Sequence, residues 1–328
     1  MNARTFQAAR LLLALCCASL LTAPARAQQD FPNHPVRLVV PFAPAGVTDT
    51  SARVLADKLS RVMGQQVLVD NRPGASGNIG TQQVAMSAPD GYTLLLAFDG
   101  TMVINPFVFP KIPFDTLRDF TPVTKMGDAA LVLVAHPSVP ANNLAELIAY
   151  SKANPGKLSF GHSGTGGTTH VAGELLKQRT GLDMQNIPYK SGGQAVADCI
   201  GGTIPLAYSA VAGAQAYLKA GRLKAIGAST PKRLASLPNV PTFIEQGVPG
   251  FDVASWVGIM VPVKTPRAIV DRLHHDLLIA LKDPELEARY EVLGVTVVAN
   301  TPEQFGEQIK ADLARWSKVV EAAKIRVD

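Results

Sequence analysis

The chain has 328 residues, with 31 Lys and Arg against 26 Asp and Glu, and it contains no run of basic residues that would indicate nucleic-acid binding. Two of its three cysteines lie in residues 1–27, so the remainder can form neither an internal disulfide nor a cysteine-based metal site. About 300 residues follow this segment, which is more than one typical core, and we therefore expect two domains.

Residues 1–27 have the features of a secretory signal peptide. Two arginines precede the apolar run LLLALCCASLL, which is too short to span a bilayer, and the segment ends in a small-x-small Ala-Arg-Ala pattern. We expect cleavage after Ala27 and export to the periplasm, with an N-terminal membrane anchor as the alternative. Cleavage would remove three arginines and no acid, leaving 28 basic and 26 acidic residues.

Strand and helix patterns then alternate. Residues 36–42 (VRLVVPF) form a continuous apolar run, typical of a strand covered on both faces. Residues 49–64 carry apolar side chains on one helical face and end at Gly64. The next expected elements are a strand at 65–71, a helix at 78–88, a strand at 92–98 and a Pro-rich passage at 105–122.

Residues 122–137 are expected to cross to a second lobe in extended conformation. Residues 255–262 look like a return crossing, and helices are expected at 269–281 and 302–323. The last helix opens with Thr301-Pro302-Glu303-Gln304, a capping box. Between the crossings we expect helices at 142–156 and 168–181, and strands at 157–162, 184–190, 203–210 and 223–230.

Alternating strands and helices predict an α/β fold with parallel sheets. Two such sets, joined by two crossing segments, predict two lobes with a hinge. We expect residues 28–124 and 254–328 to form the first lobe, and residues 125–253 the second. In open α/β sheets, ligands bind beyond the carboxyl ends of the strands, so the two lobes should face each other across a cleft.

The segment SFGHSGTGGTTH (159–170) allows three functional interpretations. A nucleophile elbow at Ser163 requires Gly-x-Ser-x-Gly, but Thr165 replaces the last glycine. A phosphate loop requires a lysine where Gly167 stands. The third interpretation is a turn of Gly, Ser and Thr at a helix N-terminus, whose N–H groups suit a carboxylate. A flexible glycine loop before a capped helix is the non-functional alternative.

Four other turns of small residues follow expected strands, at 41–49, 71–80, 97–101 and 188–195. Because such turns gather on the cleft side of each sheet, several helix N-termini should converge on one gap. This arrangement predicts a site for a small anion.

The chain resembles the Bug family, the periplasmic solute-binding proteins of tripartite tricarboxylate transporters. The resemblance covers nearly the whole chain, through blocks such as NRPGASGNIGTQQVA, GHSGTGGTTHVAGELLK, IPYKSGGQAVADCIGG and LPNVPTFIEQGVPGFD. It implies a two-lobed, type II periplasmic-binding-protein fold that closes on a small organic acid. It also implies that the turns at 42–49 and 163–170 hold a ligand carboxylate through main-chain donors, hydroxyls and waters.

Two positions depart from the family pattern. The first turn has Ala45-Gly46 where the family has two glycines, and Ser209 stands where relatives often carry an acid. An amino-acid ligand is therefore less expected, unless Asp99 supplies the missing charge; otherwise Asp99 is a turn residue that bonds the backbone.

Several residues keep two interpretations. Phe42 and Phe98 either stack on a flat ligand or pack in the core, and Lys190 either pairs with a second carboxylate or is solvated. Asp49 caps the first helix or bonds its loop, and His170 is a helix-start residue rather than a metal ligand. The residues predicted to bind ligand are Phe42, Ala43, Pro44, Ala45, Gly46, Asp49, Gly77, Asn78, Phe98, Asp99, Thr101, Ser163, Gly164, Thr165, Gly166, Thr168, Thr169, His170, Tyr189, Lys190 and Ser209.

We therefore expect a monomeric periplasmic protein that binds a small organic carboxylate, without a cofactor and without enzymatic activity. The resemblance implies membrane permease subunits as partners. The alternatives are a ligand sensor for a signalling receptor that uses the same cleft, and an exported serine hydrolase.

Overall fold

The computed structural model describes residues 31–44, 47–189 and 191–326. The expected signal peptide, Ala45, Gly46 and Lys190 lie outside these residues. The chain divides into two units, residues 1–34 and 35–328, and every element described below belongs to the second.

A six-stranded sheet forms the core of the first lobe, which we call the six-stranded lobe. Its strand order is β11-β4-β10-β3-β1-β2. β1 is parallel to β2 and β3, whereas β10 is antiparallel to β3 and β4, and β11 is antiparallel to β4. The strands are β1 (Val36–Val40), β2 (Val67–Asn71), β3 (Thr93–Phe98), β4 (Phe120–Ala129), β10 (Ser255–Pro262) and β11 (Val295–Val297).

A five-stranded sheet forms the core of the second lobe, which we call the five-stranded lobe. Its order is β7-β6-β8-β5-β9, with β6 parallel to β7 and β8, and β5 antiparallel to β8 and β9. The strands are β5 (Leu131–Ala135), β6 (Ser159–His162), β7 (Gln185–Pro188), β8 (Leu206–Ala210) and β9 (Lys224–Ala228).

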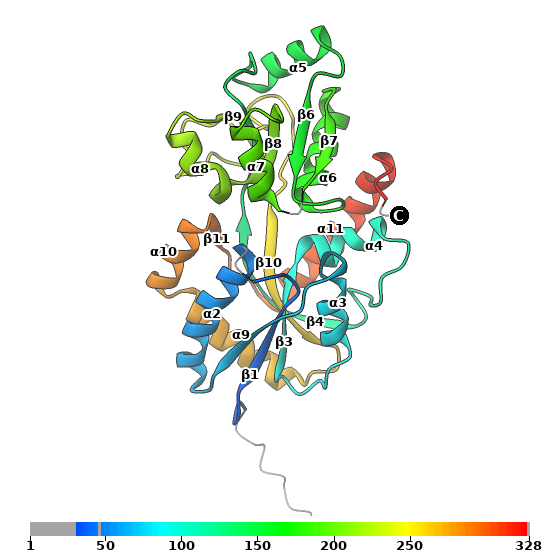
Figure 1. Ribbon diagram of the computed structural model, residues 1–328. Helices are drawn as coiled ribbons and strands as arrows, with labels where there is room; N and C mark the ends of the chain where they lie inside the picture. The colour runs from blue at the N-terminus through cyan, green and yellow to red at the C-terminus, as the bar shows by residue number, and fades with distance from the viewer. Residues whose placement is uncertain (1–30, 45–46, 190, 327–328) are drawn as a thin grey trace, which may run out of the picture. The chain divides into compact units, whose positions relative to one another are not determined.

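The two sheets share one plan, which corrects the expectation of purely parallel sheets. Each has three parallel strands followed by one antiparallel strand that has just arrived from the other lobe, β5 in one case and β10 in the other. A strand that enters from the other lobe runs opposite to the strands of the βα units beside it. Figure 1 shows β4 and β10 side by side at this crossing.

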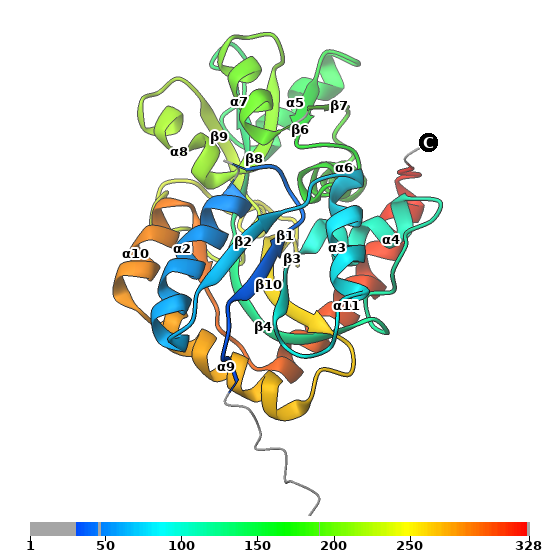
Figure 2. The same cartoon turned by 60° about the horizontal axis from the view of Figure 1, so that its bottom comes forward.

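Helices cover both faces of the six-stranded sheet. Figure 2 shows α2 and α10 on one side and α3, α4 and α11 on the other. The helices of this lobe are α2 (Val47–Met63), α3 (Asn78–Ala85), α4 (Asn105–Val108), α9 (Arg267–Leu281), α10 (Pro284–Val292) and α11 (Pro302–Ala322), with the short η1 (Ala75–Gly77) and the π-helical η2 (Gly100–Ile104). The five-stranded lobe has α5 (Leu144–Ala153), α6 (Thr168–Thr180), α7 (Gly192–Ile200) and α8 (Val211–Lys219).

The cores explain why the central strands are uniformly apolar. Leu38 in β1, Leu94 to Leu96 in β3 and all of β5 are buried, because helices lie on both sheet faces. Within the described ranges, none of the helices combines the length and apolar character that a bilayer crossing requires.

Candidate functional site

Two predicted aromatic residues meet where β1 and β3 end. The rings of Phe42 and Phe98 form a T-shaped pair with centroids 5.2 Å apart, and both side chains are half-buried. The pair therefore packs internally while part of each residue stays accessible, which is compatible with both interpretations of these aromatics. Of the other predicted residues in the first turn, Ala43 and Pro44 are exposed, and Ala45 and Gly46 lie outside the described residues.

Asp49 is buried and bonds other protein side chains near the turn after β1. It lies in the first turn of α2 and is 3% exposed. Its carboxylate oxygens accept hydrogen bonds from Arg53 Nε at 3.0 Å and from Asn71 Nδ2 at 2.9 Å. Asn71 Nδ2 also donates to the Phe42 carbonyl at 3.0 Å. Asp49 thus connects α2 to the end of β2, and Asn71 in turn connects it to the turn after β1.

The turn after β2 is held against the turn after β3. The Thr101 hydroxyl donates to the Ser76 carbonyl at 2.9 Å, and Asn105 Nδ2 donates to the same carbonyl at 3.0 Å and to Asn78 Oδ1 at 2.8 Å. Gly77 has φ 91°, and a Cβ atom there would lie 2.5 Å from Thr101 Oγ1. A side chain at this position would therefore separate the two turns.

Asp99 joins the two lobes. Its Oδ2 accepts a hydrogen bond from the Thr168 hydroxyl at 2.7 Å, and its Oδ1 accepts one from the Ser255 hydroxyl at 2.7 Å. Asp99 is 1% exposed, and this burial raises the pKa of its carboxyl from 3.8 to about 7, although the two hydroxyl donors counteract part of the rise. The carboxylate is thus held by side chains of the protein and does not project into open solvent.

In the turn between β6 and α6, residues 163–170, some main-chain N–H groups bond acceptors within the turn itself. We call this segment the α6 turn. Gly164 and Gly166 have φ values of 113° and 77°, which favour glycine. The N–H of Ser163 donates to Thr169 Oγ1 at 3.0 Å, that of Gly166 to His170 Nδ1 at 3.1 Å, and that of Gly167 to the Gly164 carbonyl at 3.1 Å.

The remaining main-chain donors of this turn stay available. Within the described part of the chain, no hydrogen bond uses the N–H groups of Gly164, Thr165, Thr168 or Thr169. The last two begin α6, a helix of 13 residues, so the positive end of the helix dipole adds to their donor strength. This set of donors can hold an anion without a positively charged side chain.

Ser163 lacks the surroundings of a nucleophile. Its side chain is exposed, and its hydroxyl lies 2.8 Å from the Thr169 hydroxyl. The Nδ1 atoms of the nearby His162 and His170 contact the turn backbone instead of this hydroxyl. Activation of serine requires a base in hydrogen-bond reach, and the described contacts do not supply one.

The last predicted residues follow the other strands of the five-stranded sheet. Tyr189 is half-buried, and its hydroxyl donates to Asp198 Oδ2 at 2.8 Å. Ser209 is 2% exposed, and its hydroxyl donates to the Ala210 carbonyl at 3.0 Å. A Cβ atom added to Gly192 would lie 3.8 Å from both Ser163 Cβ and Ser209 Oγ, so these segments converge. Lys190 lies outside the described residues.

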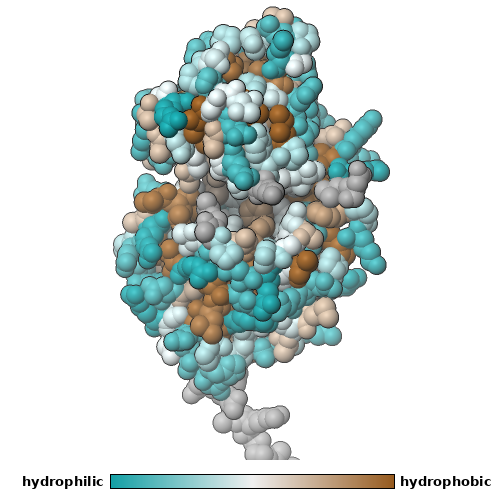
Figure 3. All heavy atoms as spheres, in the orientation of Figure 1, coloured by the Kyte–Doolittle hydropathy of each residue, from teal (hydrophilic) through white to brown (hydrophobic). Residues whose placement is uncertain are grey.

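The α6 turn also touches the six-stranded lobe beyond Asp99. A Cβ atom added to Gly166 would lie 2.8 Å from Val108 Cγ1, at the end of α4. Figure 3 shows the surface hollowed between the two lobes, on the side where these strand-end turns meet. The structure therefore brings together the described turns at 41–44, 71–80, 97–101 and 163–170.

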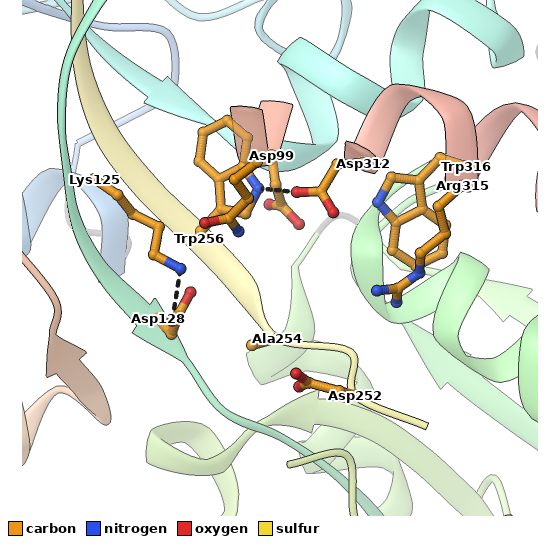
Figure 4. A pocket seen from close by; sticks show the side chains of 10 residues that line it. Asp99, Lys125, Asp128, Asp252, Ala254, Trp256, Asp312, Arg315 and Trp316 are labelled. Atoms are coloured by element: carbon orange, nitrogen blue, oxygen red, sulfur yellow. Dashed lines mark hydrogen bonds and ion pairs between the residues drawn. The ribbon is translucent and has the colours of Figure 1, made fainter. Parts of the chain in front are cut away.

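A polar cavity of about 90 Å³ lies beside the crossing strands (Figure 4). Trp256 lines it and donates from Nε1 to Asp312 Oδ2 at 2.9 Å. Lys125 Nζ forms an ion pair with Asp128 Oδ2 at 2.8 Å, and both residues belong to the crossing strand β4. The lining residues are Asp99, Lys125, Asp128, Asp252, Ala254, Trp256, Gln308, Asp312, Arg315 and Trp316.

Apart from Asp99, the charged residues of this cavity were not predicted. Burial raises the pKa of Asp252 and of Asp312, and it lowers the pKa of Arg315, whose guanidinium carbon lies 4.4 Å from the Trp316 ring centroid. The residues come from separate segments of the chain, so no spacing in the sequence indicates that they meet. Among the described residues, no group of three or more His, Cys, Asp or Glu side chains could hold a metal ion.

Comparison with known proteins identifies close relatives of this structure. Residues 51–325 match the model of the tripartite tricarboxylate transporter family receptor. The structure of R. palustris Rpa4515 with adipate is 33% identical, with a TM-score of 0.82 over 91% of this chain and 100% of that chain. The periplasmic binding protein BugD is 33% identical, with a TM-score of 0.79 over 90% of this chain and 100% of that chain.

A third solved structure, MatC from Rhodopseudomonas palustris with bound malate, is 31% identical. Its TM-score is 0.78, over 88% of this chain and 100% of that chain. Together these structures confirm the expected two-lobed periplasmic-binding-protein fold.

Proposed function

The chain belongs to the tripartite tricarboxylate transporter family receptors, and from this premise we propose that it is a periplasmic solute-binding protein that captures a small organic carboxylate between its lobes. The observation that carries the proposal is the set of unused N–H groups at the start of α6, on Gly164, Thr165, Thr168 and Thr169. Two relatives of the same fold, 33% and 31% identical, carry adipate and malate in their solved structures.

The α6 turn is proposed to hold the carboxylate directly. Helix-terminal N–H groups bind anions through hydrogen bonds and need no positively charged side chain. The turn after β1, including Phe42, would close the opposite side. Asp49, Gly77, Asn78 and Thr101 would act by holding these turns in place, because their polar side chains bond protein atoms and Gly77 leaves room for Thr101.

Ligand capture is proposed to stabilise a closed arrangement of the lobes. The Asp99–Thr168 hydrogen bond supports this idea, because it connects the loop after β3 to the start of α6. A ligand that contacts both lobes shifts the equilibrium by its differential affinity for the closed form. We propose lobe limits of residues 28–124 with 254–328, and 125–253, with β4 as one crossing strand.

Binding without catalysis is the function that we propose. Ser163 meets a threonine hydroxyl and no base, which argues against the serine hydrolase alternative. The N-terminal sequence supports export and cleavage after Ala27. Family membership supports permease subunits as partners, and we propose that the protein acts as a monomer without a cofactor.

A thermal-shift screen of residues 28–328 tests this proposal. The panel contains adipate, malate, citrate, benzoate and glutamate, each paired with its neutral amide or alcohol. A carboxylate at about 100 times its dissociation constant should add roughly 2.7 kcal/mol to the free energy of unfolding. If only the neutral partners raise the melting temperature, the carboxylate proposal is wrong.

A further inference from the structure

Two buried histidines stand at the two ends of the α6 turn and contact its backbone, and neither is among the residues with unused donors. His162 is the last residue of β6 and His170 lies in the first turn of α6, and they are 0% and 3% exposed. Their rings stack with centroids 4.2 Å apart and an interplanar angle of 9°. The pair thus joins the strand and the helix that flank the turn.

Hydrogen bonds assign opposite tautomers to the two rings. Nδ1 of His162 lies 3.1 Å from the Gly164 carbonyl oxygen, which only accepts, so this nitrogen carries the proton. Nδ1 of His170 accepts from the Gly166 N–H at 3.1 Å, so it carries none, and a neutral ring then has its proton on Nε2. One ring donates to the turn and the other accepts from it.

These two bonds set the orientation of consecutive peptide groups. In a trans peptide the carbonyl and the following N–H point in opposite directions. Because the Gly164 carbonyl points towards His162, the Thr165 N–H points to the opposite side of the turn, away from the buried rings. The Gly166 N–H points inwards to His170 Nδ1, so it is not among the N–H groups that are available to a ligand.

We propose that His162 and His170 form a stacked positioning pair, with opposite neutral tautomers, that presets the donor direction of the α6 turn before ligand arrives. The inference rests on the proposed function for its effect on ligand affinity. The tautomers and the backbone hydrogen bonds that it requires can be measured in the protein without a ligand.

Both rings must be neutral for the pair to act. On His162 a second proton would sit on Nε2, which is buried with no hydrogen-bond partner among the described residues. On His170 it would sit on Nδ1 and oppose the Gly166 N–H that this atom accepts from. The charged groups around the pair are Glu174 and Lys177 of α6, which bond each other, while Asn186 of β7 bonds Glu174.

Burial lowers the pKa of both imidazoles from 6.5 to about 4. The neighbouring His170 ring lowers the pKa of His162 further, while the Gly164 carbonyl, Asn186 and Glu174 oppose part of this change. Lys177 lowers the pKa of His170 further. The pair should therefore keep its tautomers from pH 8 down to pH 5.5. Ligand affinity should change less than twofold over this range through the two histidines.

Nitrogen-15 NMR of histidine-labelled protein tests the tautomers directly. At pH 7 and pH 5.5, long-range proton–nitrogen spectra should show His162 protonated on Nδ1 only and His170 on Nε2 only, with assignment from single His162→Asn and His170→Asn variants. A shared tautomer, or a charged ring at pH 5.5, would overturn the inference.

Conservative rescue separates positioning from general stability. The amide oxygen of His170→Asn can accept from the Gly166 N–H in place of Nδ1, whereas His170→Leu keeps bulk but offers no acceptor. We expect hydrogen exchange at Gly166 to stay within threefold of wild type in His170→Asn, and to accelerate at least 10-fold in His170→Leu. His275→Leu, at an exposed position on α9, is the control.

Adipate and malate titrations complete the test. We expect whichever of them binds wild type to bind His170→Leu at least 10-fold more weakly and His170→Asn within threefold. Equal affinity in His170→Leu overturns the positioning role while leaving the proposed function intact. If wild type binds neither acid nor any other carboxylate in the screen, the proposed function fails, and the NMR and exchange results still decide the tautomer pair.

Discussion

Asp99 is a carboxyl group whose surroundings favour its protonated form. Burial raises its pKa from 3.8 to about 7, so the folded protein binds a proton there over a range in which the unfolded chain does not. Stability contributed by this group is therefore greatest at low pH and decreases as the pH rises from about 4 to about 7. A difference of this size corresponds to an effect on the order of 4 kcal/mol at most.

Asp99→Asn should remove this pH dependence. The amide resembles the protonated acid in shape and has no proton to lose, so the variant should gain stability relative to wild type as the pH rises from 4.5 to 8. Denaturant unfolding at both pH values measures the difference. Ser255→Ala is the control with the opposite effect. The Ser255 hydroxyl stabilises the ionised Asp99 carboxylate, so its loss should raise the pKa of Asp99 further and increase the loss of stability between pH 4.5 and pH 8. A variant–wild-type difference that is the same at both pH values would contradict the assignment.

For single residues, the sequence indicated which polar side chains lie in the cleft turns, but it did not indicate which groups they bond. Asp49, Thr101 and Asp99 were all predicted as ligand-binding residues of the cleft turns, and the structure shows each of them bonded to other protein groups. Their partners lie 22, 25 and 69 residues away in the chain. A sequence pattern cannot show such pairings, because they arise only when separate turns meet.

Among the helices and strands, those with a strong local signal were predicted well. The capping box at the start of α11 is present, with Thr301 accepting from the Gln304 N–H and the Gln304 side chain accepting from the Thr301 N–H. In contrast, α10 was missed, although Asp283 caps it through the N–H groups of Glu285 and Leu286. The Pro-rich passage also contains the unexpected α4, with Pro106 in its first turn.

Two glycines, one before and one after α6, allow a matched test of this helix and its turn. Gly166 precedes α6 and has φ 77°, and Gly181 follows the last residue of α6 and has φ 68°. An added Cβ meets nothing within 4 Å at Gly181, but lies 2.8 Å from Val108 Cγ1 at Gly166. Both alanine variants should lose about 1–2 kcal/mol of stability from backbone strain.

Only Gly166→Ala should also weaken ligand binding, by at least 10-fold, because its methyl group pushes the turn away from α4. Calorimetric titration of both variants with adipate, or with the best carboxylate from the screen, provides the measurement. Equal losses of affinity in the two variants would mean that helix stability, not the position of the turn, limits binding.

For the whole molecule, the contact between Asp99 and Thr168 predicts how the lobes respond to ligand. Thr168→Val removes the hydroxyl that donates to Asp99 but keeps the side-chain shape and the main-chain N–H. Small-angle X-ray scattering should show a decrease in radius of gyration when wild type binds a carboxylate, and a smaller decrease in Thr168→Val at equal ligand saturation. A wild-type radius that is unchanged at saturation would rule out closure.

The sequence by itself determined the α/β class, the two crossings and the family of this protein, because apolar periodicity, turn residues and helix caps act over a few residues. Only the tertiary structure decided that entering strands run antiparallel, that Asp99 joins the two lobes, that a charged cavity lies beside the crossing strands, and that His162 and His170 stack next to the α6 turn. Those features depend on distances between segments far apart in the chain, and burial alters the protonation of the groups that meet there.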